Sequence, residues 1–156
     1  MAKKNRLSID FKGFQEYYEK LDRMGTDIKK ITEEALEKSF RTVTPGIQAA
    51  IAPHSVRFTG ATEDSLVKEP NVKWDGNTGS VKVGFDITNG GLPSIFLMYG
   101  TPRHGVENQY GKASGSHPGM AVDQTLYNSI YGTSTKNKVR KVQKEVFDKA
   151  LQEALK

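Results

Sequence analysis

The 156-residue chain contains no cysteine. Disulfide bonds and thiolate metal sites are therefore excluded, and the fold must be held by packing and hydrogen bonds. Long apolar runs are missing as well. The longest covers residues 95–99, far short of the roughly 20 apolar residues that a membrane-spanning helix needs. The charged N-terminal sequence lacks the apolar stretch of a secretory signal peptide. We therefore expect a soluble protein.

Apolar residues are scarce, at 36% of the chain. Globular domains typically contain about 45–50%, counting glycine. A chain of this length suits one domain and can bury roughly 70% of the surface that its unfolded form exposes. We expect a single domain over residues 1–156, with a flexible N-terminus at residues 1–8. Its low apolar content predicts a thin or elongated shape, or a core that partners complete.

The net charge of +5 is unevenly placed. Residues 1–135 carry a net charge of +1, and residues 136–156 carry +4. A run of basic side chains with no acid among them can face phosphate groups or a partner, and the alternative is a solvated helix face. The run consists of Lys136, Lys138, Arg140, Lys141 and Lys144.

Apolar residues that recur at three- and four-residue intervals predict four helices. These cover residues 11–24, 27–50, 120–131 and 135–155. Gly25 is placed to end the first helix, and Thr26 or Asp27 to cap the second. Pro45 interrupts the second pattern. Either the helix kinks there, or Thr44 caps a new short helix that begins with Pro45.

Regular alternation of apolar and polar residues predicts a half-buried strand over residues 80–87. Residues 66–74 form a second extended segment, and a loop of about five residues joins the two. A short apolar run over residues 94–99 predicts a strand that is covered on both faces. The alternating strand is expected to pack, through Phe85, on three residues of the long helix: Ile31, Ala35 and Phe40.

Residues 100–119 contain five glycines, two prolines and two histidines. They predict a long glycine-rich loop over residues 101–119, which either docks on a partner or is a passive surface loop. Its candidate partner-binding residues are Thr101, Arg103, His104, Glu107, Lys112 and His117. Helices, antiparallel strands and helices follow one another along the chain. This order predicts an α+β fold with N-terminal helices, a small antiparallel sheet, and C-terminal helices packed on the sheet.

One cluster of residues has the chemistry of metal ligands: His104, Glu107 and His117. The spacing matches no helix-borne zinc pattern, so we interpret these residues as polar loop residues. The stretch Ser114-Gly115-Ser116-His117 contains serine nucleophiles and a histidine base, but neighbours in a flexible loop lack the fixed geometry of a catalytic pair. No phosphate-binding glycine motif is present. We expect no enzymatic activity, no cofactor and no metal.

Several short motifs follow one another in a specific order along the chain. They are Phe11-Lys12-Gly13-Phe14 with Leu21, Ala52-Pro53, Thr59-Gly60, Ser65-Leu66, Val83-Gly84-Phe85, Tyr99-Gly100-Thr101 and His117-Pro118-Gly119. In this order and spacing the chain resembles the tail-completion, or head–tail joining, family of long-tailed bacteriophages, whose members are also labelled minor tail components. The chain departs from the family pattern at Thr62, where a leucine is common, and at Met98, where a glutamate is common.

The resemblance implies a structural protein of the virion neck that is made in the host cytoplasm and acts late in tail assembly. It implies a homo-oligomeric ring, of about six copies by analogy with closed cyclic assemblies, and a monomer in isolation. The implied partners are the tail terminator and the head-completion, or stopper, protein. DNA would pass through the ring without sequence-specific binding. The alternative is a small nucleic-acid-binding protein that uses the basic C-terminal helix.

Overall fold

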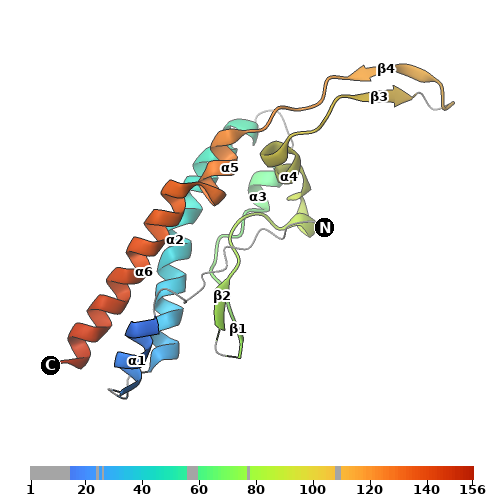
Figure 1. The fold of residues 1–156 in the computed structure, drawn as a ribbon. Coiled ribbons are helices and arrows are strands. Elements are labelled where there is room, and N and C mark those ends of the chain that lie inside the picture. Colours follow the sequence, from blue (N-terminus) through green and yellow to red (C-terminus); the bar gives the residue numbers. More distant parts are fainter. Residues whose placement is uncertain (1–14, 24, 26, 56–59, 77, 108–109) are drawn as a thin grey trace.

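A computed structural model of the chain describes residues 15–23, 25, 27–55, 60–76, 78–107 and 110–156 (Figure 1). The elements are α1 (Gln15–Arg23), α2 (Ile28–Ser55), α3 (Ala61–Asp64), β1 (Val72–Asp75), β2 (Thr78–Val81), the 3₁₀ turn η2 (Ile87–Asn89), α4 (Leu92–Tyr99), β3 (His104–Glu107), β4 (Ala113–His117), α5 (Gln124–Tyr131) and α6 (Thr133–Ala154). This order confirms the predicted α+β class, with two small antiparallel sheets. The C-terminal helices α5 and α6, however, pack mainly on α2 and not on a sheet as predicted. The expectation for residues 1–8 falls outside the described residues. Across the described ranges, no helix has the length and apolarity to cross a bilayer.

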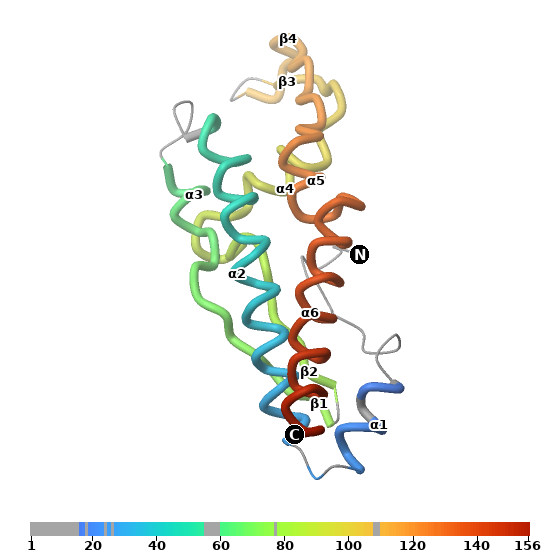
Figure 2. Tube along the Cα trace, turned by 90° about the vertical axis from the view of Figure 1, so that its left-hand side faces the viewer, coloured from blue at the N-terminus to red at the C-terminus, as the bar shows by residue number. Residues whose placement is uncertain are grey.

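Two long helices form the axis of the molecule. Helix α2 has 28 residues, about 42 Å at 1.5 Å per residue, and α6 lies along it (Figures 1 and 2). Gly25, with φ of 68°, follows the end of α1 as predicted. Asp27 caps α2, because its Oδ1 accepts a hydrogen bond from the Lys30 N–H at 3.2 Å. The chain thus turns sharply between α1 and α2, and α1 contacts both α2 and α6.

Helix α2 runs without a break through Pro45. The alternative in which Thr44 caps a new helix is therefore wrong. Thr44 instead donates its hydroxyl hydrogen bond to the Phe40 carbonyl, at 2.9 Å. The carbonyl that loses its N–H partner is that of Arg41, one turn earlier, and both Arg41 and Pro45 are exposed, so water can reach this carbonyl and the proline is tolerated. Helix α2 also continues through Pro53 to Ser55, five residues beyond the end predicted at residue 50.

The β1–β2 hairpin packs along α2. Its register pairs Asp75 with Thr78, which makes the connection shorter than the predicted five residues. Gly79 on β2 lies so close to α2 that a Cβ there would meet the Leu36 side chain at 3.0 Å. Trp74 on β1 donates its indole N–H to Glu33 of α2, at 2.8 Å. The strand predicted over residues 80–87 is wrong beyond Val81, where β2 ends: Phe85 makes only an isolated bridge with Leu66, and residues 87–89 form η2. The inward side of the pattern is confirmed for Val81, Val83 and Phe85, which are buried, whereas Ile87 is 40% exposed.

Residues 92–99 form helix α4, so the strand predicted over residues 94–99 is wrong. The buried residues of α4 are Ser94, Leu97 and Met98. Positions separated by three and four residues lie on the same side of a helix, so these three form its buried face. Pro93 lies in the first turn of α4, where a backbone N–H has no helical acceptor, so the missing N–H of proline costs no hydrogen bond. A short apolar run fits a buried strand and a helix equally well by pattern alone, and here the proline-led turn selects the helix.

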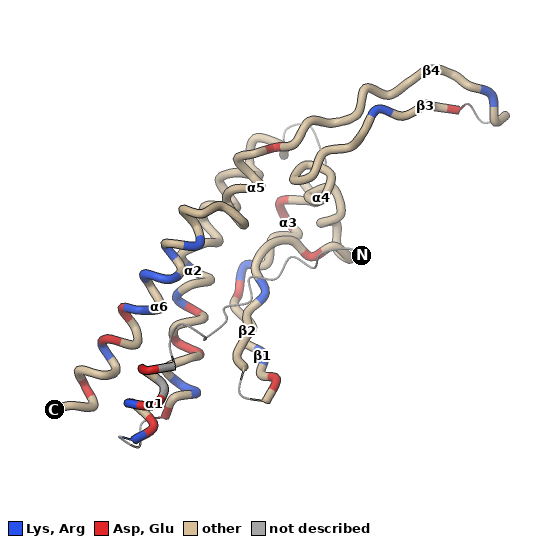
Figure 3. The backbone as a smooth tube through the Cα atoms, in the orientation of Figure 1, with Lys and Arg blue, Asp and Glu red and all other residues tan. Residues whose placement is uncertain are grey.

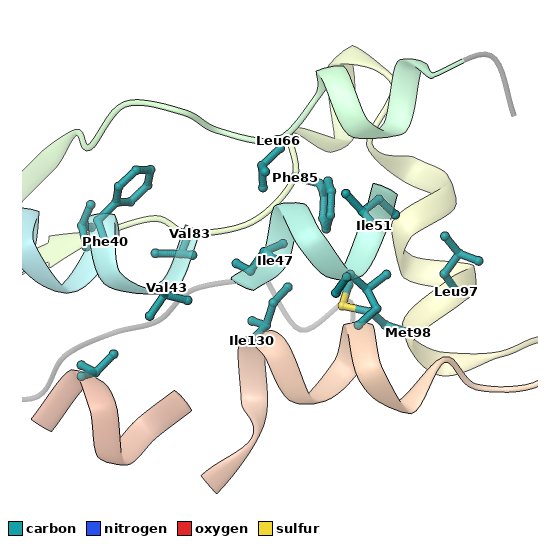
Figure 4. Packing of buried hydrophobic residues seen from close by; sticks show 14 of the residues in the cluster. Phe40, Val43, Ile47, Ile51, Leu66, Val83, Phe85, Leu97, Met98 and Ile130 are labelled. Atoms are coloured by element: carbon teal, nitrogen blue, oxygen red, sulfur yellow. The ribbon is translucent and has the colours of Figure 1, made fainter. Parts of the chain in front are cut away.

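The core consists of two clusters. The larger joins α2 to the strands, α4, α5 and the start of α6, and Figure 4 shows Phe85 beside Ile47, Ile51 and Leu66. The smaller joins α1, the start of α2 and the end of α6. Phe85 therefore shares a cluster with Phe40, as predicted, but the prediction was wrong for the other two helix residues. Those residues, Ile31 and Ala35, belong to the smaller cluster because the strand reaches α2 further toward its C-terminus.

Replacement of Phe85 by alanine tests the larger cluster. Phe85 is 6% exposed, so Phe85→Ala should lower the free energy of unfolding by about 3–5 kcal/mol, as truncation of a buried aromatic ring does. Phe96→Ala is the matched control, since Phe96 on α4 is 44% exposed and should lose less than about 1 kcal/mol. Urea unfolding of both variants measures the difference. Equal losses would show that the two rings are placed incorrectly.

Candidate functional site

Residues 101–119 form a projecting β-hairpin, not the structureless loop predicted from their glycines. Strands β3 and β4 pair antiparallel, with His104 opposite His117, and a bulge follows Val106. Every residue of both strands is exposed, and in Figure 1 the pair extends well beyond the helices. Because neither face of the pair is buried, the sequence carried no alternating pattern to reveal the strands. We call residues 101–119 the arm.

The arm is fixed to the body at its base. Thr101 and Met120 exchange two backbone hydrogen bonds, of 2.9 and 3.0 Å, immediately outside the strands. Glycine is required on both sides of this bridge. Gly100 and Gly119 have φ angles of 69° and 84°, and a Cβ at either position would overlap the backbone across the bridge. The base is therefore a tight crossing of two chain segments from which the arm can project.

Polar side chains stabilise the first residues of the arm. Arg103 donates to the Ser116 hydroxyl from Nε and Nη2, at 3.3 and 2.9 Å. The rings of His104 and His117 stack across the strands, with centroids 5.1 Å apart and planes inclined by 20°. The Gly119 N–H donates to Nδ1 of His117 at 3.1 Å. These contacts tie one strand to the other where the arm leaves the body.

The three candidate metal ligands are only partly brought together. His104 and His117 stack, whereas Glu107 lies toward the outer end of β3, opposite Ala113. In the part of the chain that the structure describes, no three His, Cys, Asp or Glu side chains are grouped closely enough to hold a metal ion. The remaining predicted residues, Thr101 and Lys112, lie at the base and just before β4. The arm thus has the composition of a polar contact surface.

Two residues that the sequence did not single out stabilise the region behind the arm. His54, near the end of α2, contacts Asp123 with Nε2 2.5 Å from Oδ2, and both side chains are about one-quarter to one-fifth exposed. Asp123 also caps α5 by accepting the Leu126 N–H at 2.8 Å, and its own N–H donates to the Leu97 carbonyl of α4. Asp123 therefore links α2, α4 and α5 at the point where the chain comes back from the arm. The sequence signal for this residue is a capping aspartate directly before the helix, and α5 begins at Gln124, four residues after the predicted start at residue 120.

The basic run lies on α6, and all five of its side chains are exposed. Lys141 is 4.0 Å from Glu145, one helical turn later, and Lys149 similarly lies 3.7 Å from Glu153. Figure 3 shows these charges along the side of α6, well away from the arm. The helix therefore presents a mixed but mainly positive face, with its N-terminal half the more basic. The residues of this half are Lys136, Lys138, Arg140, Lys141 and Lys144.

Comparison of the chain with models of protein families, with curated proteins and with solved structures yields no match.

The base of the arm can be tested at Gly119. Gly119→Ala should destabilise the base by about 1–2 kcal/mol or more, because it combines a left-handed backbone angle with a clash against the Thr101 segment. Gly105→Ala within the arm is the control, since a Cβ there meets nothing within 4 Å and its φ is ordinary. Hydrogen exchange at residues 101–120 reports the base directly. Equal protection in the two variants would contradict this account.

The Asp123 contact predicts a specific dependence of stability on pH. Burial raises the pKa of Asp123, but hydrogen bonds from the Leu126 N–H and His54 outweigh it, and the pKa lies below its usual value of 3.8. A lowered folded-state pKa adds stability above the unfolded-state pKa, and this is lost as the pH falls through the folded-state value. The part of the stability gap between wild type and Asp123→Asn that comes from this carboxylate should therefore be present at about pH 5 and shrink as the pH falls below about 4. Thermal unfolding at several pH values measures it, and a gap that persists unchanged in acid would disprove the assignment.

Proposed function

We propose that this chain is a structural, non-enzymatic protein of the neck of a long-tailed bacteriophage, and that it acts in tail completion and head–tail joining. The observation that supports this most strongly is the arm, a β-hairpin held by a rigid base and exposed along its whole length. An isolated two-stranded hairpin is only marginally stable in water. Such an element is useful chiefly when a partner covers it, and that is the situation of a subunit in a large assembly.

The order of sequence motifs supports the specific kind of assembly. The motif glycines occupy positions where the fold needs them: Gly60 has φ of 77° before α3, and Gly100 has φ of 69° at the base of the arm. The proposed partners are other neck proteins, namely the tail terminator and the stopper protein, together with further copies of this chain in a ring. In this proposal the arm supplies the contacts with these partners, and the positive face of α6 is not required for joining.

The arm and the basic face can be separated by experiment. Deletion of residues 104–117 leaves the base bridge intact, so the melting temperature should change little, but a phage genome carrying the deletion should yield tails that do not join heads. The matched control replaces Lys136, Lys138, Arg140 and Lys144 by glutamine and should keep head–tail joining. Infectious particles at normal titre from the arm deletion would rule out the proposed function.

Salt-dependent DNA binding tests the nucleic-acid alternative with the same two proteins. If four cations of α6 contacted phosphates, the logarithm of the binding constant would fall with the logarithm of salt concentration with a slope of about −3.6. We expect the wild type and the four-glutamine variant to bind duplex DNA equally weakly. A steep slope in the wild type that disappears in the variant would favour the nucleic-acid-binding protein.

A further inference from the structure

Helix α4 carries an exposed apolar stripe that nothing in the described part of the chain covers. Leu92, Phe96 and Tyr99 are 49%, 44% and 44% exposed, and their spacing of four and three residues places them on one face. The opposite face of the same helix is buried in the core. Val122, 48% exposed, extends the stripe beside Gly100. Large apolar side chains grouped in this way mark a surface that is used for contact.

The surface beside the stripe is acidic. Helix α3 and the turn η2 both contact α4, and between α3 and η2 lies an open hollow of about 430 Å³ whose lining includes Asp64 and Asp86. Residues 61–66 and 86–99 together contain three carboxylates and no lysine or arginine. Hydrogen bonds from the Thr88 hydroxyl and then from Asn89 lower the pKa of Asp86, which keeps this carboxylate charged in mild acid. A ligand of this surface should therefore combine apolar side chains with positive charge.

The arm has the complementary properties. Its outer half presents Val106, which is 41% exposed, and Tyr110, which is 77% exposed. Over residues 101–119 it carries Arg103 and Lys112 against a single carboxylate, a net charge of +1. Strand β3, with four residues, is about 13 Å long, and the eight residues of α4 span about 12 Å, so the two elements match in length.

The arm cannot reach the stripe of its own chain. It begins immediately after Gly100, the residue that ends α4, and the Thr101–Met120 bridge directs it outward from there (Figure 1). We propose that the arm of one copy docks on the α4 stripe and the neighbouring acidic hollow of a second copy. The inference rests on the proposed assembly role and specifies its subunit contact. Because the two surfaces are different, every copy can give an arm to one neighbour and receive one from another, which is the head-to-tail contact that closes into rings.

The absence of cysteine allows a direct test by disulfide trapping. Val106→Cys on the arm and Phe96→Cys on the stripe are made in separate chains that carry tags of different size, and the two purified proteins are mixed at high concentration under oxidising conditions. We expect a mixed dimer to form at least tenfold faster than in a mixture of Val106→Cys with Gln152→Cys. Gln152 is an exposed position near the C-terminal end of α6. That end of α6 lies far from α4 (Figure 1). Equal rates in the two mixtures would overturn the inference.

Charge exchange tests the same contact without relying on disulfide chemistry. Lys112→Glu and Asp64→Lys should each slow the trapping several-fold, and a chain that carries both substitutions should recover most of the rate, because each interface then regains an opposite-charge pair. Melting temperatures of the three variants check that the fold is intact. Failure of the double variant to recover would show that the acidic hollow is not the receiving surface.

The outcomes for the interface and for the proposed function can be told apart. If arm and stripe are trapped together but a phage with the arm deletion remains infectious, the contact is real and the neck function is wrong. If the arm deletion blocks head–tail joining but trapping never exceeds the Gln152→Cys control, even in assembled tails, the arm docks on a different protein and this inference is wrong.

Discussion

One apolar stripe of α2 is the contact on which every other part of the structure depends. Its largest members, Leu36, Phe40, Val43, Ile47 and Ile51, are at most 4% exposed, and each contributes about 1.5–3 kcal/mol by its burial. The β1–β2 hairpin packs on this helix from one side, and α5 and α6 pack on it from another. Because most elements meet α2 rather than one another, the molecule is long and thin, which accounts for its low apolar content.

The arm depends on α2 only indirectly, through the elements at its base. None of its described residues is buried, so its position comes from the Thr101–Met120 bridge and from the elements that hold the bridge. Asp123 is central here, since it joins the end of α2, the last turn of α4 and the first turn of α5 within a few residues of the base. The structure thereby separates two tasks: the helices provide stability, and the arm provides reach.

The exposed face of α4, like the arm, lies outside the buried core. A helix that buries Leu97 and Met98 fully could have a polar outer face, yet it presents Phe96 and Tyr99 to solvent. Tyr99 also packs edge-on against Tyr127 of α5, with ring centroids 5.9 Å apart, which holds one end of the stripe in place. A fixed apolar strip beside a row of carboxylates is suited to receiving an ordered element of opposite charge, and pre-ordering of both surfaces lowers the entropy cost of their association.

The sequence by itself determined the elements whose pattern reflects a buried face. The helices of α1, α2, α5 and α6 and the inward residues Val81, Val83 and Phe85 were predicted because burial on one side imposes a period of 3.6 or 2 on the apolar residues. It also determined the arm's charged residues as contact candidates. It could not distinguish helix from strand in the apolar run of α4, where too few residues define a period. It gave no sign of β3 and β4, because a hairpin exposed on both faces has no apolar side. Only the tertiary structure brought His54 to Asp123, 69 residues away, and left one face of α4 uncovered, since both results depend on where α2 places its distant neighbours.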